Sequence, residues 1–233
     1  MLAIDRCAAL RHVSIFADAA DPTLSHVAAT SRWQRYASGN TILSYQDNST
    51  DIFFVLEGRA RAVIYSFEGK ASLFADLNRG DVFGEIAAID GGRRSAGVEA
   101  IESTLVAAMT ASAFEEILRG DPDVSLATLK LLTRTVRRLS DRVYEFRALA
   151  VQNRIQAEFL RLAVASGATT GEVLLSPAPP LAEIADRVST HREAVSRELS
   201  RLGALGLIVR DGGALRITDL PRLSELVREA RGE

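Results

Sequence analysis

The spacing of apolar residues changes along the chain of 233 residues and predicts several kinds of element. Residues 1–30 carry apolar positions at helical intervals, so we expect helix there. Residues 33–110 hold short apolar or alternating runs that glycine, asparagine and aspartate interrupt, with turn signals at 67–70 (FEGK) and 78–81 (NRGD). Short runs with turns roughly every 8–12 residues predict a β sandwich or β roll.

A longer helical pattern follows, in which apolar residues are spaced by three and four in turn. The positions are Leu129, Leu132, Val136, Leu139, Val143, Phe146 and Ala150. A seam with a period of about 3.5 residues is typical of a helix that pairs with another helix. We therefore expect a dimerisation helix, with Asp121 as its N-cap and Pro122 in its first turn. The alternative is an amphipathic helix that packs on its own domain.

The last third of the chain predicts two short helices and a hairpin. Residues 151–167 favour a helix that ends at Gly167, and a short strand and a proline-rich turn follow. In residues 180–208, a first helical pattern turns Leu181, Ile184, Ala185 and Val188 inward, and a second turns Ala194, Val195, Leu199 and Leu202 inward. The second begins near Thr190, with Ser189 or Thr190 as its cap and Glu193 completing a capping box. Two such helices predict a helix-turn-helix, and residues 207–219, with two glycines at the tip, predict a wing beside it.

The outward face of the second helix carries candidate DNA-contact residues. These are Thr190, His191, Arg192, Glu193, Ser196, Arg197 and Arg201. Arginine can donate two hydrogen bonds to guanine and glutamate can accept from cytosine, so Arg192, Glu193 and Arg197 are candidate base readers. His191, Ser196 and Arg201 are candidate phosphate contacts. The alternative is a solvated face that holds ion pairs such as Glu193–Arg197.

Composition excludes several classes of protein. Hydrophobic residues make up 47% and charged residues 25%, as in ordinary globular proteins. No apolar run approaches the roughly 20 residues of a membrane span, and the N-terminus lacks the pattern of a signal peptide, so we expect a cytoplasmic protein without a membrane partner. Cys7 is the only cysteine and the three histidines lie far apart, so we expect neither a disulfide framework nor a metal site. Without a Ser–His–acid set or a P-loop, we expect no enzyme. The net charge of −2 neither requires nor excludes nucleic acid.

Two stretches make the chain resemble the CRP–FNR family of transcription regulators, in particular its cyclic-AMP receptor branch. FGEIAAIDGGRRSAGVEA (83–100) resembles the phosphate-binding cassette of that family, and STHREAVSREL (189–199) resembles its recognition helix. The order of elements matches over about residues 15 to 220. The resemblance implies an α+β chain with three parts: a cyclic-nucleotide-binding β roll (1–120), a long dimerisation helix (121–150) and a winged helix-turn-helix DNA-binding domain (151–233).

The resemblance also implies a ligand site and its residues. They are Gly84, Glu85, Ile86, Arg94, Ser95 and Ala96 of the cassette, with Leu139 and Ser140 of the long helix. In such a cassette, Gly84 lets the backbone approach the ligand, and a short helix points N–H groups at the phosphate. Arg94 neutralises the phosphate with a forked hydrogen bond, Ser95 adds a hydroxyl, and Glu85 accepts from the ribose 2′-hydroxyl. The alternative is that Glu85 and Arg94 form a structural ion pair across the loop.

By the same resemblance, we expect a homodimer joined through residues 121–150 that binds a palindromic double-stranded DNA site and works with RNA polymerase. Cyclic AMP is the first choice of effector. Cyclic GMP stays open, because Leu139 stands where the cyclic-AMP receptor offers threonine to adenine and because a hydroxyl at Ser95 favours guanine in related domains. Two other functions also stay open: a cyclic-nucleotide-binding module that regulates a partner protein, and a family member that senses another effector or none.

Overall fold

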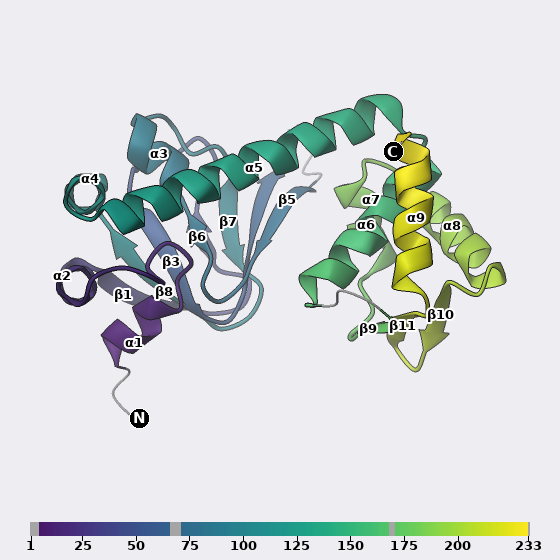
Figure 1. The fold of residues 1–233 in the computed structure, drawn as a ribbon, viewed down its shortest axis with the longest axis horizontal. Coiled ribbons are helices and arrows are strands. Elements are labelled where there is room, and N and C mark those ends of the chain that lie inside the picture. The colour runs from purple at the N-terminus through teal and green to yellow at the C-terminus, as the bar shows by residue number, and fades with distance from the viewer. Residues whose placement is uncertain (1–4, 66–70, 168–170, 233) are drawn as a thin grey trace. The chain divides into compact units, whose positions relative to one another are not determined.

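The structure is a computed structural model that describes residues 5–65, 71–167 and 171–232 (Figure 1). The predicted turn at 67–70 lies outside the described residues. The chain divides into two compact units, Met1–Val136 and Arg137–Glu233, and the division falls within one long helix. None of the helices in the described part of the chain has the length and apolar character that a bilayer crossing requires.

The first unit combines eight strands with several helices. Its strands are β1 (Arg32–Tyr36), β2 (Thr41–Leu43), β3 (Ile52–Glu57), β4 (Ala60–Tyr65), β5 (Ala71–Leu77), β6 (Val82–Phe83), β7 (Gly97–Ala100) and β8 (Thr104–Met109). Its helices are α1 (Arg6–Arg11), α2 (Asp21–Thr30), α3 (Glu85–Asp90), α4 (Ala111–Gly120) and the first part of α5 (Pro122–Ala148). The helical character predicted for residues 1–30 is present as two short helices within the described part.

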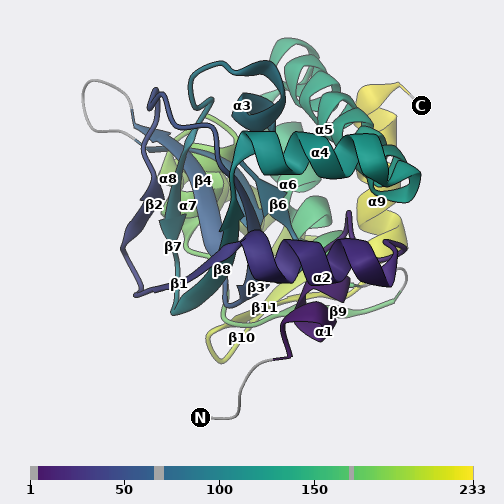
Figure 2. The ribbon, with the colours of Figure 1, turned by 90° about the vertical axis from the view of Figure 1, so that its left-hand side faces the viewer.

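The strands form two antiparallel four-stranded sheets, with the orders β1-β8-β3-β6 and β2-β7-β4-β5. Helices α2 and α4 lie across one side of the strands (Figure 2). The predicted turn at 78–81 is present, since the N–H of Asp81 donates to the carbonyl of Asn78 over 3.0 Å. This is the β roll that the short apolar runs predict.

Strand β3 lies at the centre of the unit because its residues are apolar on both faces. Ile52, Phe54 and Leu56 pack in the cluster that includes α2, α4 and the start of α5. Phe53 and Val55 point to the opposite face and pack in the cluster that includes the second sheet. Side chains alternate between the faces of a strand, so this unbroken apolar run serves two cores.

Helix α5 begins as the sequence predicts and ends slightly earlier. The Asp121 carboxylate accepts from the backbone N–H groups of Asp123 (3.1 Å) and Val124 (3.2 Å), which confirms it as the N-cap. The predicted seam was wrong at its last position. Ala150 has an extended backbone and is the N-cap of the next helix, because the last turn of α5 closes with the bond from the N–H of Leu149 to the carbonyl of Glu145.

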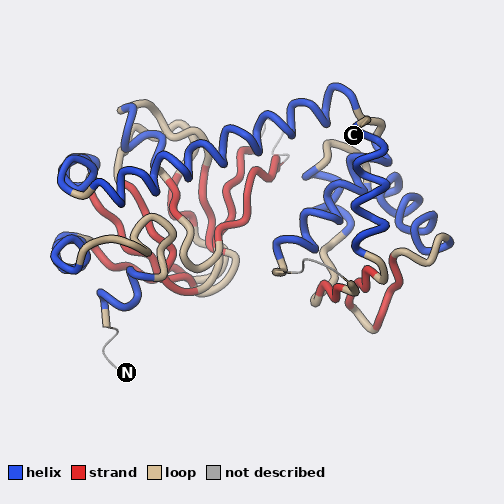
Figure 3. The backbone as a smooth tube through the Cα atoms, in the orientation of Figure 1, coloured by secondary structure: helices blue, strands red, loops and turns tan. Residues whose placement is uncertain are grey.

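The second unit combines a group of helices with a three-stranded sheet of order β10-β11-β9, which lies at one end of that group (Figure 3). Beyond α5 it contains α6 (Val151–Ala165), β9 (Val173–Leu175), α7 (Leu181–Arg187), α8 (Arg192–Ala204), β10 (Ile208–Asp211), β11 (Ala214–Ile217) and α9 (Leu220–Arg231). The hairpin β10–β11 turns through Gly212 (φ 52°) and Gly213 (φ 94°), and β9 pairs with β11. Both turn residues have positive φ, which glycine adopts without the steric penalty of a Cβ atom. The predicted wing is therefore present.

Candidate functional site: a phosphate-type cassette and a helix-turn-helix

The glycine-rich stretch 83–100 forms a compact turn around a short helix. Strand β6 ends at Phe83, Gly84 takes a left-handed conformation (φ 78°), and α3 follows directly. Gly91 (φ 70°) ends this helix. The chain then returns through Arg94 to strand β7. The two glycines thus allow a sharp entry into the helix and a sharp exit from it.

Arg94 is the most unusual residue of the cassette, because it is charged and only 2% exposed. Its guanidinium donates three hydrogen bonds to its own chain. Nε donates to the hydroxyl of Ser49 (3.1 Å), Nη1 to the carbonyl of Gly84 (3.1 Å) and Nη2 to the carbonyl of Asp51 (2.7 Å). The backbone of Arg94 is fixed as well, since its N–H donates to the carbonyl of Asp47 (2.9 Å). The loop before β3 therefore holds this arginine inside the cassette.

The electrostatic surroundings of Arg94 are those of a buried cation. Burial lowers the pKa of its guanidinium, and the nearby carboxylates of Asp51, Asp47 and Glu85 act in the opposite direction. The guanidinium carbon lies 5.7 Å from the ring centroid of Phe53, a distance at which the ring face attracts a cation. The nearby carboxylates favour the protonated guanidinium, and the Phe53 ring and the two backbone carbonyls hold it in one orientation.

Gly84 is required by its neighbours as well as by its backbone angle. A Cβ atom there would lie 2.7 Å from Nη1 of Arg94 and 2.9 Å from the carbonyl oxygen of Asp51. Both separations are shorter than carbon normally tolerates. The close approach that we expected toward a ligand is, in this structure, an approach toward the arginine and the loop that holds it.

The other predicted cassette residues surround Arg94 with different degrees of exposure. Glu85 and Ala96 are half-buried, Ser95 is exposed, and Ile86 is exposed on α3. Sequence reasoning missed Ser49 and Asp51, which hold the arginine. No local signal could have found them, because they lie more than 40 residues before Arg94 in the chain and one of them acts through its backbone.

The predicted dimer seam lies on an exposed face of α5 within the chain. Its exposed members are Leu129, Val136, Leu139, Val143 and Phe146. Val136 is 62% exposed and Leu139 is 47% exposed, which is unusual for large apolar side chains. Ser140, the other predicted ligand contact on α5, is also exposed. Both Leu139 and Ser140 belong to the unit of residues 137–233, and their contact with a ligand stays a prediction.

Helices α7 and α8 form the predicted helix-turn-helix. Ile184 and Val188 pack with Val195, Leu199 and Leu202 in the core of the second unit, as the sequence pattern predicts. This core determines which side chains of α8 point inward. The remaining side chains form the outer face of the helix.

The predicted cap of α8 was wrong. Ser189 has a left-handed backbone (φ 49°), and the N–H of Thr190 still bonds back to the carbonyl of Ala185 (2.9 Å). Ser189 therefore lacks the extended backbone that an N-cap needs, and the Thr190 N–H closes the turn that follows α7. The N-cap is His191, whose side chain makes no capping hydrogen bond and whose carbonyl accepts from Ala194 (3.0 Å).

Most of the candidate DNA-contact residues lie on the outer face of α8 and the turn before it. His191, Arg192, Glu193 and Arg197 are exposed, whereas Thr190 and Ser196 are half-buried. The four exposed side chains lie at the start and in the first turns of α8, the part of a recognition helix that meets base edges, and their contact with DNA stays a prediction.

Arg201 has a different environment from the other candidates. It donates to both carboxylate oxygens of Glu198, over 2.9 Å from Nε and 2.8 Å from Nη2. Glu198 is buried and also accepts from Nε2 of Gln156 on α6 (2.6 Å). Sequence reasoning missed Glu198. Its carboxylate accepts two hydrogen bonds from Arg201, so fewer N–H groups of Arg201 remain for a phosphate.

The residues described by the structure contain no group of three or more His, Cys, Asp and Glu side chains suited to hold a metal ion. What they contain is an arginine-centred cassette in the first unit and a winged helix-turn-helix in the second. Comparison with protein families agrees with both. Residues 33–121 match the cyclic nucleotide-binding domain, and residues 153–226 match the Crp-like helix-turn-helix domain.

This combination defines a class: DNA-binding transcription regulators that carry a cyclic-nucleotide-binding domain, and not enzymes. The chain belongs to the CRP–FNR family of transcription regulators. It is similar to the cAMP-activated global transcriptional regulator CRP of Salmonella typhimurium, with 28% identity over 82% of this chain and 92% of that protein. It is also similar to the CRP-like cAMP-activated global transcriptional regulator of Mycobacterium tuberculosis, with 24% identity over 83% of this chain and 87% of that protein.

Solved structures share the fold at lower identity. A CooA variant from Carboxydothermus hydrogenoformans matches with a TM-score of 0.73 and 22% identity, over 85% of this chain and 88% of that one. CLP from Xanthomonas campestris, a regulator described as responsive to c-di-GMP, matches with a TM-score of 0.71 and 17% identity, over 85% of this chain and 99% of that one. These two likenesses concern the fold alone.

Proposed function

We propose that this chain is a cytoplasmic homodimeric transcription regulator that binds a palindromic DNA site in response to a cyclic nucleotide. The observation that carries the proposal is the presence, in one chain, of the Arg94 cassette and of a recognition helix with exposed Arg192, Glu193 and Arg197. The first supplies a cation for a phosphate, and the second supplies donors and an acceptor for base edges. The proposal includes RNA polymerase as the partner through which binding changes transcription.

The geometry of Arg94 leaves capacity for a phosphate. A guanidinium has five N–H groups, and its hydrogen bonds to the described residues use one on each nitrogen. One N–H on each Nη therefore remains for the anion. Ser95, exposed beside it, offers a hydroxyl, and Glu85 offers an acceptor for a ribose hydroxyl. Cyclic AMP is the proposed effector, because the relatives from Salmonella typhimurium and Mycobacterium tuberculosis are described as cAMP-activated.

The exposed seam of α5 supports the dimer. Leu129 and Val136 of the first unit, and Leu139, Val143 and Phe146 of the second, are large apolar side chains that stay exposed in the single chain. A second copy of α5 would cover the seam in the manner of a coiled coil. Because each copy carries one helix-turn-helix, a two-fold dimer presents two recognition helices to half-sites about one helical turn apart.

A second candidate is a regulator that responds to another effector or to none. The observation that favours it is the burial of Arg94 behind oxygen atoms of its own chain. In that case, the cassette has a structural role only, and the loop at 47–51 supplies the hydrogen-bond acceptors that a ligand would otherwise offer to Arg94.

One titration tests these candidates. The purified protein is mixed with cyclic AMP, cyclic GMP or c-di-GMP, and its affinity for a duplex selected from a random pool is measured. The proposal expects cyclic AMP to raise the affinity for that duplex at micromolar to millimolar concentration. A response to cyclic GMP or c-di-GMP alone would correct the effector, and tight duplex binding that no nucleotide changes would favour the second candidate.

Salt dependence tests the DNA partner itself. A protein that neutralises several phosphates loses about a thousandfold or more in affinity between 50 mM and 200 mM salt. The proposal therefore expects a steep loss across this range. Binding to the selected duplex that does not change with salt would indicate that α8 serves a protein partner instead.

A further inference from the structure

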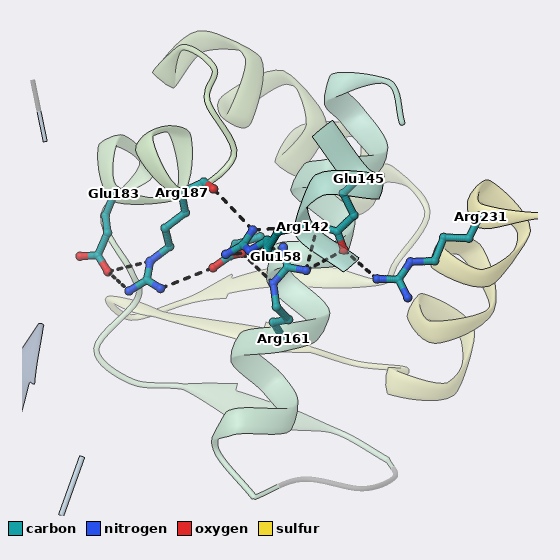
Figure 4. Close-up of polar contacts among 7 residues, drawn as sticks. All are labelled: Arg142, Glu145, Glu158, Arg161, Glu183, Arg187 and Arg231. Atoms are coloured by element: carbon teal, nitrogen blue, oxygen red, sulfur yellow. Dashed lines mark hydrogen bonds and ion pairs between the residues drawn. The ribbon is translucent and has the colours of Figure 1, made fainter. Parts of the chain in front are cut away.

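Seven charged side chains gather around the C-terminal turns of α5 (Figure 4). They are Arg142 and Glu145 of α5, Glu158 and Arg161 of α6, Glu183 and Arg187 of α7, and Arg231 of α9. All belong to the unit of residues 137–233. The side chains of Glu145 and Glu158 are each only 2% exposed. Buried carboxylates persist only where cations and hydrogen bonds compensate for their lost hydration, so the contacts of these two define the cluster.

Glu145 connects α5 to α6 and α9. Its carboxylate accepts from Nη1 of Arg161 over 2.8 Å and 3.0 Å, one bond to each oxygen, and from Nη2 of Arg231 over 2.6 Å. Tyr144 adds a bond from its hydroxyl to the carbonyl of Arg231 (2.9 Å). These bonds attach the end of α5 to the last helix of the DNA-binding unit.

Glu158 connects α5 to the helix-turn-helix itself. Nη2 of Arg142 lies 3.0 Å from its carboxylate, Nε of Arg161 donates to it over 2.9 Å, and Nη1 of Arg187 lies 3.6 Å away. Arg187 is the last residue of α7 and also pairs with Glu183 of the same helix (2.9 Å). Glu158 thus lies between the dimer helix and the first helix of the helix-turn-helix.

Arg142 makes a second, direct contact with α7. Its Nη1 donates to the backbone carbonyl of Arg187 over 3.4 Å, while its Nη2 faces Glu158. Burial lowers the pKa of the Arg142 guanidinium, and the carboxylate of Glu158 opposes that change. The seam residues Leu139 and Val143 lie on the exposed side of the same turns. One guanidinium therefore joins the seam-bearing turns of α5 to the end of α7.

We propose that Arg142 is a positioning residue for DNA binding, which through Glu158 and the Arg187 carbonyl makes the last turns of α5 one body with the helix-turn-helix. The inference rests on the proposed function, since it assumes a dimer that reads two half-sites. Its consequence is that the angle between the two recognition helices is set by the seam at Leu139 and Val143. A change driven by an effector then acts N-terminal to Arg142 and not at the short connection between α5 and α6.

The main test is Arg142→Lys. Lysine keeps the charge, but one ammonium cannot donate to the Glu158 carboxylate and the Arg187 carbonyl in the fork geometry of arginine. Affinity is measured for three duplexes: the selected operator, the operator with its half-sites moved by two base pairs, and a single half-site. We expect wild type to lose about tenfold or more on the altered spacing, because the recognition helices are held about one helical turn apart.

The variant should behave differently on the three duplexes. We expect about tenfold weaker binding to the operator, less than about threefold further loss on the altered spacing, and half-site binding equal to that of wild type. Arg138→Lys, at an exposed position one turn earlier, is the matched control and should keep the wild-type pattern. A variant that keeps the spacing preference of wild type would overturn the proposal. A variant that loses half-site binding would also overturn it, since Arg142 would then serve only the folding of the unit.

Hydrogen exchange of the wild-type protein tests the same proposal without DNA or a variant. Segments that open together share one opening free energy and one dependence on denaturant. We expect amides of residues 142–148 to exchange together with those of α6 and α8. If they exchange with residues 124–136 instead, the proposal is wrong, even where the protein proves to be dimeric and DNA-binding. If no duplex with two symmetric half-sites can be selected while these amides do exchange with α6 and α8, the proposed function fails. The rigid connection between the end of α5 and the helix-turn-helix is then still supported.

Discussion

Arg94 carries a charge into the interior of the cassette, and its neighbours show how that charge is tolerated. Two backbone carbonyls, a serine hydroxyl and the face of Phe53 surround it. Without this guanidinium, the carbonyls of Gly84 and Asp51 would lose their donor. Substitutions at this position are therefore expected to change stability and binding together.

The first prediction concerns Arg94→Leu. It should abolish the response to the cyclic nucleotide, because no other cation is buried in the cassette within the described residues to meet the phosphate. It should also lower the free energy of unfolding by about 1–3 kcal/mol, because the carbonyls of Gly84 and Asp51 lose their donor. Ligand titration and denaturant unfolding measure the two effects. Arg93→Leu, at the exposed neighbour, is the control and should change neither.

The second prediction separates the two reasons for glycine at position 84. Gly84→Ala and Gly91→Ala both place a side chain in a left-handed conformation, which costs about 1–2 kcal/mol. Only at Gly84 would the new Cβ meet atoms closer than 3 Å. We expect the unfolding free energy to fall further for Gly84→Ala than for Gly91→Ala. Equal losses would mean that the Arg94 guanidinium moves aside at no cost.

At this scale, the sequence predicted the chemical groups but not their partners. The cassette motif named Gly84, Glu85 and Arg94 together, and these three residues lie close to one another, while their contact with a ligand stays a prediction. It could not give Ser49 and Asp51, because their contact with Arg94 arises from the packing of a distant loop. Glu198 could not be predicted for the same reason. Its burial became evident only from its hydrogen bonds with Gln156 and Arg201 in the folded chain.

The carboxylate of Asp121 caps the N-terminus of helix α5. It also accepts from the hydroxyl of Thr23 (2.7 Å) and the N–H of Ala20 (3.3 Å), which connects α2 to α5. Burial alone would raise the pKa of Asp121, but the hydrogen bonds from Thr23 and three backbone N–H groups outweigh that effect and hold the pKa below its usual value.

The third prediction follows from the direction of that change. A carboxyl with a lowered folded-state pKa contributes its full stability above the unfolded-state pKa, near 3.8, and loses it as the pH falls through the folded-state value. Asp121→Ala should therefore lower the unfolding free energy at pH 7 by about 0.5–2 kcal/mol, and the deficit relative to wild type should shrink below about pH 4. Denaturant unfolding at several pH values measures this. Asp123→Ala, at an exposed first-turn position, should show a smaller deficit at pH 7.

Elements were predicted from periodicity more reliably than their ends. The seam spacing predicted α5, and the apolar pattern predicted α7 and α8. The start of α8 was wrong because Ser189 and Thr190 are good capping residues by type. The tight turn instead gives Ser189 a left-handed backbone and ties Thr190 to α7. Turn geometry of this kind depends on how two helices pack, which the types of neighbouring residues do not encode.

At the scale of the whole molecule, the seam of α5 is the surface that the proposed assembly must cover. The fourth prediction is that replacing Val136 and Val143 together by glutamine converts a dimer into monomers, because it removes apolar surface from the centre of the seam. Analytical ultracentrifugation measures the change, and operator affinity should fall with it. Arg134→Gln introduces the same residue at an off-seam position of α5 and should leave the dimer intact. A double variant that stays dimeric would place the interface elsewhere.

The order of parts was readable from the sequence. The predicted boundaries followed the resemblance, set the long helix apart as residues 121–150 and stay a prediction. The compact units of the structure divide within that helix, between Val136 and Arg137. The sequence alone assigned no partners to the charged residues of α5. Only the folded chain shows that Arg142 and Glu145 are turned toward α6, α7 and α9.

The fork between Arg201 and the buried Glu198 has a consequence for how such a regulator changes its targets. Glu198 and Gln156 anchor the inner side of α8 to α6 independently of the side chains that point outward. Arg192, Glu193 and Arg197 can then be exchanged without repacking the helix beneath them. Under the proposed function, substitutions at these three positions would change the DNA sequence that the protein prefers, while the packing of α8 on α6 stays the same.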